Sequence, residues 1–459
     1  MDETFDVVVI GAGPAGENVA GRVAGGGLTV AVVEAELVGG ECSYWACMPS
    51  KALLRPGEVL AAARRVPGAE QAVTGEIDVN AALARRDELA DNWNDESQVQ
   101  WLEGAGATLV RGRGRITGER LVSVTVGDGT ERSLRAAKAV VAATGSAASI
   151  PPIPCLGDIR VWDSRAATSA KKVPRRLIVL GGGVVGVEMA QAWKRLGATE
   201  VTIVEAAERL VTNLEPFAAA QLATALTEDG IEVVIASKAV RADRAGADGP
   251  VRLTLEQGRV IEADELLVAV GRRPLTQDLG LESIGLEPGK YIAVDDSLRA
   301  SGVDGGWLFA IGDVNGRAPL THQGKYQARI CADVILGKAM TAWADHVAVP
   351  SVVFTDPQIG SVGLTEAKAR DKGLKVRTVR YETAAIAAAS TRGTKTVGTC
   401  QLVIDDDRNV VVGATFVGPE IGELVHAATI AIIGEITLDR LWHAVPAFPT
   451  MSELWLRLL

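Results

Sequence analysis

The sequence predicts an α/β fold in three parts, and three observations lead to this prediction. An apolar strand, a glycine-rich turn and a helical stretch follow one another twice, first from about residue 6 and again from about residue 176. The chain has 459 residues, about the length of three domains. From residue 345 onward no glycine fingerprint occurs, and β-branched runs precede a helical stretch at 422–433. We therefore expect two α/β units followed by an α+β module.

The composition is typical of a globular protein, with 47% hydrophobic and 23% charged residues. The formal net charge of −10 argues against a nucleic acid or an anionic membrane surface as the main partner. No apolar run approaches the 18 residues that suggest a membrane span. Residues 1–6 are acidic and do not resemble a secretory signal, so we expect a cytoplasmic protein.

The first glycine turn directly follows the apolar strand 6–10 and contains Gly11, Gly13 and Gly16. Gly11 permits the tight turn, Gly13 lets the backbone approach a pyrophosphate, and Gly16 lets the helix pack closely on the strand. The next predicted strand ends in Glu34, at the spacing of the acid that accepts hydrogen bonds from a ribose. This pattern predicts a dinucleotide site at the N-terminus of the helix.

The second glycine turn repeats the same pattern with Gly181, Gly183 and Gly186, and its second strand ends in Glu205. Two dinucleotide sites in one chain indicate electron transfer between two cofactors, although a duplicated fold with one inactive site is the alternative. Glu205 lies where a 2′-phosphate would need a cation, which favours NADH over NADPH. Arg209, four residues later, weakens this preference.

Two of the five cysteines, Cys42 and Cys47, lie close together after the first unit's second strand. A bridge between them needs a locally distorted turn, which would make the bond strained and reducible. We favour a redox-active pair. A zinc site and a pair of inert thiols are the alternatives, but no second Cys/His pair at ligand spacing accompanies the first. We expect the other three cysteines to be buried small hydrophobic residues: Cys155, Cys331 and Cys400.

The segment 39–51, GGECSYWACMPSK, resembles the active-site signature of the FAD-dependent pyridine nucleotide–disulfide oxidoreductases. That family includes dihydrolipoamide dehydrogenase, glutathione reductase and mercuric reductase. The likeness extends over essentially the whole chain and includes Thr144-Gly145, Gly271-Arg272-Arg273-Pro274 and Gly312-Asp313. It implies FAD and NAD(P)H as cofactors, and a homodimer in which the partner's C-terminal segment contributes to the active site.

The resemblance also implies roles for individual residues. FAD would lie along the first glycine turn, with Asp313 at its ribityl chain. Lys51 and Glu188 would form an ion pair beside the flavin. Cys47 would contact the flavin, and Cys42 would exchange with the substrate. The remaining cofactor-binding positions that the resemblance implies are Thr144, Gly145 and Gly271.

The C-terminal motif departs from the family pattern at the position of its base. Members that exchange disulfides end in a His-x-His-Pro-Thr-x-Ser-Glu run, in which the second histidine is the acid–base group; here Phe448 takes that place and Glu453 is retained. A phenyl ring cannot transfer a proton, and losing such a group typically costs about 10²–10⁴-fold in rate. His443 is a candidate replacement. Tyr44, Trp45 and Phe448 would either line an aromatic acceptor pocket or pack at the dimer contact.

We predict two Rossmann-like dinucleotide-binding domains, for FAD and NAD, and a C-terminal α+β dimerisation domain. The expected bounds are 1–150 for the FAD domain, 151–270 for the NAD(P) domain, 271–344 for a central segment returning to the FAD domain, and 345–459 for the dimerisation domain. The predicted function is NAD(P)H-dependent reduction of a disulfide, or oxidation of a dithiol, without the usual histidine. An NAD(P)H:quinone or other small-acceptor reductase is the alternative; a mercuric reductase-like enzyme and a non-catalytic flavin-binding protein are further hypotheses. We expect no bound metal.

Overall fold

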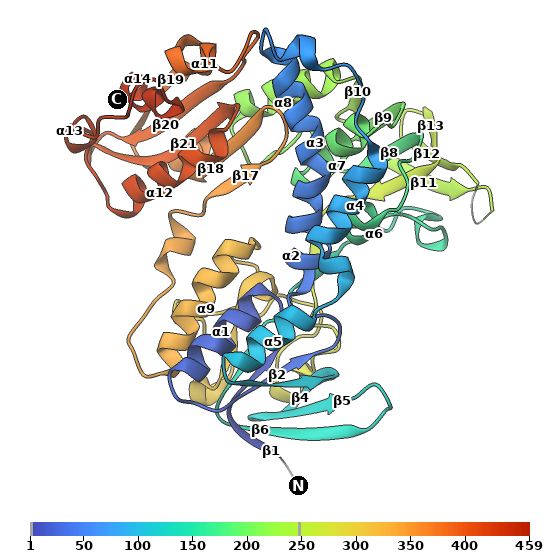
Figure 1. Cartoon of the computed structure of the whole chain (residues 1–459). Coiled ribbons are helices and arrows are strands. Elements are labelled where there is room, and N and C mark those ends of the chain that lie inside the picture. The colour runs from blue at the N-terminus through green and yellow to red at the C-terminus, as the bar shows by residue number, and fades with distance from the viewer. Residues whose placement is uncertain (1–2, 247–248) are drawn as a thin grey trace. The chain divides into compact units, whose positions relative to one another are not determined.

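The computed structural model of the chain describes residues 3–246 and 249–459 (Figure 1). The chain divides into two compact units, each assembled from separated segments. Unit 1 comprises the segment up to residue 49 together with Asp87–Ala148 and Arg272–Asp345. Unit 2 comprises Ser50–Arg86, Ser149–Gly271 and His346–Leu459.

Unit 1 is built on a mixed sheet in which β3, β2, β1 and β6 are parallel neighbours in that order, and β16 pairs with β6. The parallel strands are continuous apolar runs because both faces of the sheet are covered; Val7, Val8 and Val9 have no exposed surface. The strands of unit 1 are β1 (Glu3–Ile10), β2 (Val30–Glu34), β3 (Ala107–Arg111), β4 (Arg113–Gly118), β5 (Leu121–Thr125), β6 (Glu131–Ala142), β7 (Ser146–Ala148), β15 (Arg272–Pro274) and β16 (Leu308–Ala310).

Two helices of unit 1 lie side by side on one face of this sheet (Figure 1). They are α1 (Pro14–Gly25), which follows the first glycine turn, and α9 (Thr321–Ile335). The Arg22 side chain of α1 and Asp333 of α9 form an ion pair at 2.8 Å. The other helices of unit 1 are α2 (Gly40–Tyr44) and α5 (Glu96–Gly104), and two helices run from one unit into the other: α3 (Cys47–Arg65) and α4 (Val79–Leu89).

Unit 2 contains a second parallel sheet in the order β10-β9-β8-β14, next to a three-stranded antiparallel sheet in the order β11-β12-β13. The strands of these sheets are β8 (Arg176–Leu180), β9 (Glu200–Val204), β10 (Ile231–Val234), β11 (Ala239–Arg244), β12 (Val251–Leu255), β13 (Val260–Ala263) and β14 (Glu265–Val268). Their helices are α6 (Ser164–Ser169), α7 (Val184–Arg195) and α8 (Pro216–Glu228). The order β8–α7–β9 repeats the order β1–α1–β2 of unit 1.

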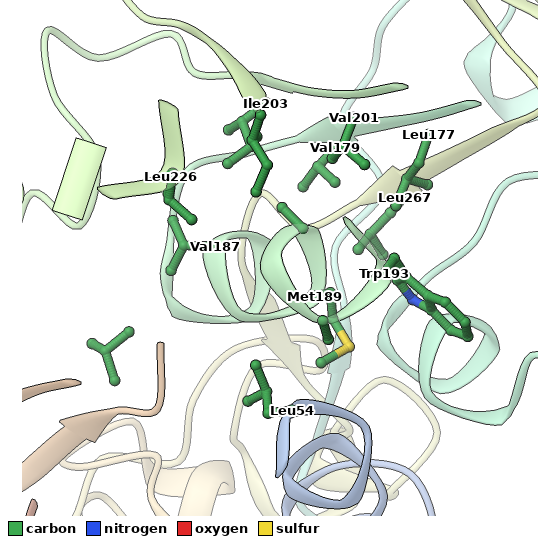
Figure 2. Close-up of a cluster of buried hydrophobic side chains, with 14 of the residues drawn as sticks. Leu54, Leu177, Val179, Val187, Met189, Trp193, Val201, Ile203, Leu226 and Leu267 are labelled. Atoms are coloured by element: carbon green, nitrogen blue, oxygen red, sulfur yellow. The ribbon is translucent and has the colours of Figure 1, made fainter. Parts of the chain in front are cut away.

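The hydrophobic core of this part of unit 2 forms around α7 (Figure 2). Val187, Met189 and Trp193 project from this helix and are almost completely buried. The Trp193 ring lies 5.7 Å from the ring of Trp162, centroid to centroid. Leu54 of α3 contributes to the same core.

The C-terminal segment of unit 2, His346–Leu459, is the expected α+β module. Its antiparallel sheet has the order β17-β18-β21-β20-β19, and every residue of β20 and β21 is buried. The strands are β17 (Ser351–Val353), β18 (Gln358–Gly363), β19 (Val376–Glu382), β20 (Thr399–Asp405) and β21 (Val410–Gly418). The helices are α10 (Glu366–Asp371), α11 (Ala387–Ser390), α12 (Val425–Ile433), α13 (Leu438–Leu441) and α14 (Leu454–Leu458).

The predicted α/β class and the α+β character of the last part are therefore confirmed. None of the helices in the described ranges combines the length and the apolar character that a bilayer crossing demands.

Truncating the central side chain of the α7 core tests this packing. Trp193 has no exposed surface, so we expect Trp193→Ala to lower the free energy of unfolding by about 3–5 kcal/mol. Urea titration followed by circular dichroism measures the change. The matched control is Trp343→Ala, whose side chain is 47% exposed and whose removal should cost less than about 1 kcal/mol. Equal losses in the two variants would contradict this account of the core.

Candidate active site

Each predicted glycine fingerprint begins with a glycine that the backbone geometry requires. Gly11 and Gly181 have φ angles of +102° and +109°, which strain any residue with a Cβ atom. A Cβ at Gly11 would also lie 2.4 Å from the Ala143 carbonyl oxygen, and one at Gly181 would lie 2.5 Å from the Ala269 oxygen. These first glycines therefore allow the turn to pass close to a neighbouring strand.

The third glycine of each fingerprint lets the helix approach that turn. A Cβ at Gly16 would lie 1.8 Å from the Gly11 carbonyl oxygen, and one at Gly186 would lie 2.0 Å from the Gly181 oxygen. Neither contact could be relieved by moving a side chain, because both involve backbone atoms. The predicted packing role of both glycines agrees with these distances.

The middle glycines, Gly13 and Gly183, differ from the other two because no protein atom would lie close to a Cβ added at either position. A Cβ at Gly13 would meet nothing closer than 4.0 Å, and one at Gly183 would meet nothing within 4 Å. Both residues have φ angles near −70° that any amino acid adopts. The open space lies at the N-termini of α1 and α7, where backbone N–H groups and the helix dipole favour a phosphate. These cradles fit the two predicted dinucleotides.

The predicted ribose-binding acids support the glycine turns. The Ala12 N–H donates to Glu34 Oε2 at 2.6 Å, and the Gly182 N–H donates to Glu205 Oε2 at 2.6 Å. Burial raises the pKa of Glu34, although backbone N–H donors act in the opposite direction. Each acid thus lies against its glycine turn, where its remaining lone pairs can accept hydrogen bonds from ribose hydroxyls.

Asp313 lies in a polar cluster that joins three sequence motifs of unit 1. The Ser146 hydroxyl donates to Asp313 Oδ2 at 2.5 Å, and the Arg272 guanidinium donates to the Ser146 hydroxyl and carbonyl, both at 2.7 Å. Arg272 also donates to Glu41 Oε1 at 3.3 Å. Asp313 was predicted as a site residue, whereas no role was predicted for Ser146 or for Arg272, although both stand directly beside predicted site residues in the chain.

Thr144 and Gly145 lie at the end of β6. The Thr144 hydroxyl is buried and has no hydrogen-bond partner among the described residues, which fits a position that bonds to a ligand. Gly145 has a φ angle of +72°, and its carbonyl accepts the Leu275 N–H at 3.0 Å. Gly271, which belongs to unit 2, has a φ angle of +141° and open space beside its Cα.

The two cysteines of the predicted redox pair contact each other through a break between two helices. α2 ends before Trp45, whose backbone leaves the helical region (φ −137°, ψ −3°), and α3 begins at Cys47. Cys42 and Cys47 are both thiols, and they share a hydrogen bond. The pKa of Cys42 is raised, mainly by this hydrogen bond and next by burial. The Cys47 sulfur also lies 3.2 Å from the Thr321 hydroxyl. The distorted connection that a bridge would need is present.

The other cysteines agree only in part with their prediction. Cys331 and Cys400 are fully buried, and burial raises the pKa of Cys331 and raises that of Cys400 to about 12. Cys155 is only partly buried and has a φ angle of +64°, so its assignment as a buried residue was wrong. Within residues 3–246 and 249–459 the structure shows no cluster of three or more Cys, His, Asp or Glu side chains that could hold a metal ion.

The predicted ion pair forms within unit 2. Lys51 Nζ lies 2.8 Å from Glu188 Oε2, and the Glu188 side chain is almost completely buried. The second carboxylate oxygen of Glu188 accepts the Phe354 N–H at 2.9 Å. Lys51 Nζ also lies 4.7 Å from the centroid of the Phe354 ring. The Glu188 carboxylate is therefore held from two sides, with a cation on one oxygen and a backbone donor on the other.

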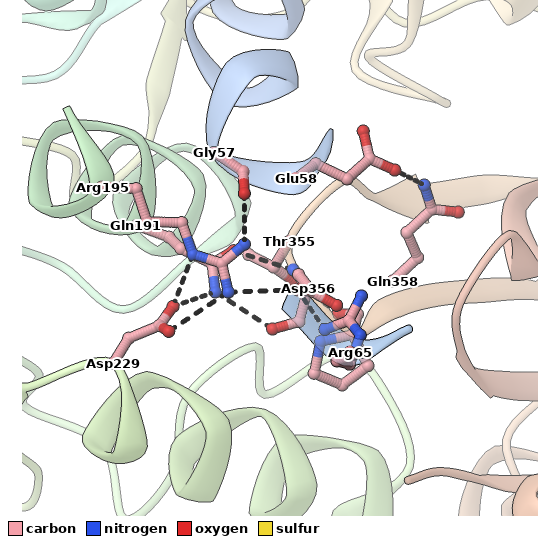
Figure 3. A network of polar contacts seen from close by, with 10 residues as sticks. Gly57, Glu58, Arg65, Gln191, Arg195, Asp229, Thr355, Asp356 and Gln358 are labelled. Atoms are coloured by element: carbon pink, nitrogen blue, oxygen red, sulfur yellow. Dashed lines mark hydrogen bonds and ion pairs between the residues drawn. The ribbon is translucent and has the colours of Figure 1, made fainter. Parts of the chain in front are cut away.

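A polar network continues along the same face of α7 (Figure 3). Gln191 exchanges two hydrogen bonds with the backbone of Asp356, at 2.8 and 3.0 Å. Arg195 pairs with Asp229 at 2.9 Å and with Asp356 at 3.1 Å, and Arg65 pairs with Asp356 at 2.7 Å. This network was not predicted, although polar residues at helical spacing in an otherwise apolar helix are a visible signal.

At the position of the family histidine, Phe448 is 74% exposed and is followed by a cis peptide bond to Pro449. Glu453 is buried, and its Oε2 atom makes no hydrogen bond among the described residues. His443, the candidate replacement base, is exposed on the same module. Glu453, the carboxylate that would orient a histidine in the family pattern, is therefore retained, although position 448 holds no histidine.

Tyr44, one of the two aromatic residues between the cysteines, belongs to the interior of unit 1. Tyr44 is completely buried, and its hydroxyl donates to the Val38 carbonyl at 3.0 Å. Its ring packs edge-on against Trp45, with centroids 5.7 Å apart. Tyr44 thus supports the α2 region from inside unit 1 and does not face an open pocket there.

Comparison with known proteins gives a consistent result. The family model described as pyridine nucleotide-disulphide oxidoreductase matches residues 5–328, and the model for the dimerisation domain of that family matches residues 349–458. The chain is 34% identical to dihydrolipoyl dehydrogenase 3 of Pseudomonas aeruginosa over 99% of this chain and 97% of the relative. It is 31% identical to a mercuric reductase of Staphylococcus aureus over 98% of this chain and 81% of the relative.

Solved structures show the same relationship. A Cu(II) complex of RclA, an HOCl-induced flavoprotein disulfide reductase from Escherichia coli, superimposes with a TM-score of 0.87 at 25% identity, covering 99% of both chains. LpdA from Mycobacterium tuberculosis gives a TM-score of 0.86 at 26% identity, covering 98% of both chains. The predicted resemblance, fold class and cofactors, FAD and NAD(P)H, are confirmed. The chain belongs to the pyridine nucleotide-disulphide oxidoreductase family.

Proposed function

We propose that the protein reduces a disulfide, or oxidises a dithiol in the reverse direction, through Cys42 and Cys47, with electrons exchanged with NAD(P)H. The observation that carries this proposal is the contact between the two thiols at the break between α2 and α3. When bound, FAD relays the electron pair between the nicotinamide and this cysteine pair. The Lys51–Glu188 ion pair, four residues along α3 from Cys47, is proposed to support the charge beside the flavin.

The exchange with a disulfide acceptor balances as two successive substitutions. The Cys42 thiolate attacks one sulfur of the acceptor, forms a mixed disulfide and expels the first product thiolate. Cys47 then attacks the Cys42 sulfur, closes the Cys42–Cys47 bond and expels the second product thiolate. Each product takes up one proton. With Phe448 at the position of the family base, we propose that these protons come from solvent.

NADH is the favoured nucleotide in this proposal. Glu205 offers a carboxylate where NADPH carries its 2′-phosphate, and the two negative charges would repel each other. Arg209, the nearby cation, donates to the carbonyl oxygens of Thr212 and Leu214, each at 2.7 Å. Because its guanidinium is engaged with its own loop, Arg209 gives little support to NADPH.

We further propose the homodimer and the domain bounds predicted from the sequence. The α+β module exposes large apolar side chains near the family histidine position, including Trp442, Val445 and Phe448, of which Val445 is 78% exposed. Exposed apolar residues that gather on one module suggest a surface that a partner covers. The match of this module to a dimerisation domain supports the same reading.

A thiophilic metal ion is a second candidate acceptor, and Phe448 is the residue that favours it. Two thiolates can pass electrons to a metal ion without any proton transfer to the product, so a missing base matters less. Relatives of the chain include mercuric reductases, and one solved relative is described as a Cu(II) complex. A quinone that accepts electrons directly from the flavin, without the cysteines, is the remaining alternative.

Paired glycine substitutions test the two nucleotide sites separately. Both Gly13→Ala and Gly183→Ala add a methyl group that the protein has room for but that a bound phosphate would meet. We expect Gly13→Ala to purify with reduced FAD content. Gly183→Ala should retain FAD and show a KM for NADH raised about tenfold or more. The ratio of flavin to protein absorbance and steady-state kinetics measure these effects; loss of FAD in Gly183→Ala alone would contradict the assignment.

Replacing the exchanging thiol separates the candidate acceptors. We expect Cys42→Ser to reduce NADH-dependent disulfide reduction to the background rate, because the attacking sulfur is lost. Reduction of Cu(II) or Hg(II) should fall with it, whereas quinone reduction should change less than about twofold. Cys155→Ser is the control, since Cys155 lies outside the pair. An unchanged rate with disulfides in Cys42→Ser would refute the proposed dithiol mechanism.

Restoring the family base tests the account of Phe448. We expect Phe448→His to accelerate reduction of small disulfides and to recover part of the about 10²–10⁴-fold that a positioned acid–base group supplies. The Glu453 Oε2 atom, which has no partner among the described residues, is suited to orient the new imidazole. Phe448→Leu controls for the loss of the aromatic ring and should give no acceleration. If Phe448→His leaves the disulfide rate at the wild-type value, proton supply is not what limits turnover.

A further inference from the structure

The N-terminus of α9 lies against the cysteine pair. The helix has 15 residues and begins at Thr321, directly after Leu320 in an extended conformation. The Thr321 hydroxyl lies 3.2 Å from the Cys47 sulfur and also hydrogen-bonds to Cys42. Lys325 follows one helical turn later, so it shares the face of α9 that carries Thr321.

We propose that Thr321 and Lys325 are positioning residues that stabilise negative charge on the two sulfurs, and that they take over part of the work of the histidine missing at position 448. This inference deepens the proposed dithiol function and rests on it. Thr321 would donate its hydroxyl hydrogen to a thiolate, while the Lys325 ammonium would supply a nearby positive charge and keep its own proton. The proton released from each thiol would pass to solvent.

The effect on each sulfur follows from the groups around it. The pKa of Cys42 is raised overall, first by its hydrogen bond to Cys47, then by burial and by the charge of Cys47. The Thr321 hydroxyl and the Lys325 ammonium act in the opposite direction. The Thr321 hydroxyl lies 3.2 Å from the Cys47 sulfur and also bonds to Cys42, so it can donate to a thiolate on either sulfur.

Other charged groups near the pair are engaged or oppose the thiolates. Glu17 of α1 is partly buried, its pKa is raised by burial, and it interacts electrostatically with Lys325. Glu41, next to Cys42 in the chain, accepts a hydrogen bond from Arg272. Among the groups named here, Lys325 is thus the cation that favours ionisation of Cys42.

The pH dependence of Cys42 alkylation tests the role of Lys325. The full-length holoenzyme is reduced with dithiothreitol, treated with limiting iodoacetamide across a pH series and analysed by mass spectrometry. Removing a positive charge disfavours the thiolate, so we expect Lys325→Met to move the apparent midpoint upward by about 0.5–1 pH unit. Lys325→Arg should restore the wild-type midpoint. Arg329→Met, which removes an exposed cation one turn further along α9, should leave the midpoint unchanged.

The long-wavelength thiolate–flavin absorbance of the reduced holoenzyme tests the role of Thr321. We expect Thr321→Val to weaken this band at neutral pH and to move its titration to higher pH, because the hydroxyl donor is lost. Thr321→Ser should restore both properties, since the serine hydroxyl keeps the donor.

Two results would overturn the inference: an unchanged alkylation midpoint in Lys325→Met, or an equal shift in Arg329→Met. If Thr321→Val left the long-wavelength band unchanged, Thr321 would have no part in stabilising the thiolate. These outcomes differ from a failure of the proposed function, which would appear as disulfide reduction that survives Cys42→Ser. Alkylation follows the charge on the sulfur rather than turnover, so it remains informative in either case.

Discussion

The approach of a helix to the end of its own strand is the constraint on which both nucleotide sites depend. At Gly16 and Gly186 the space left for a side chain is occupied by a backbone carbonyl at 2.0 Å or less. Only this close packing brings the N-termini of α1 and α7 to the carboxyl edges of their sheets, where a helix end can bind a phosphate. The same geometry occurs twice, so the two proposed cofactor sites share one structural solution within a single chain.

Local signals made much of this architecture predictable. The apolar strands, the glycine turns and the terminal acids are all encoded within about 25 residues of one another, and each has one dominant physical reason. The cysteine pair was equally visible, because Cys42 and Cys47 are near neighbours in sequence. Their spacing indicated that a bridge would need a distorted turn, and the helical structure between them is interrupted at Trp45.

The contacts that support the site could not be predicted in the same way. Thr321 lies 274 positions from Cys47 in the chain, and Arg272 lies 126 positions from Ser146. No local pattern relates such residues, since their contact depends on how separate segments assemble into one unit. The compact units themselves are discontinuous in sequence, and no local pattern marked Ser50–Arg86 as part of unit 2. Glu188 was identified through a family resemblance, but Gln191 and Arg195, which lie on the same face of α7 and bond to Asp356, were not.

The bond from the Phe354 N–H to Glu188 gives the α+β module a role beyond subunit contact. One carboxylate oxygen of Glu188 is satisfied by Lys51 and the other by a main-chain amide that belongs to a different part of the sequence. Because that amide comes from the backbone, no substitution of Phe354 except one to proline removes the donor, and its position depends on the path of the chain. Recombination between relatives at the border of this module would therefore alter the electrostatics of a buried acid, which gives a physical reason for these segments to be inherited together.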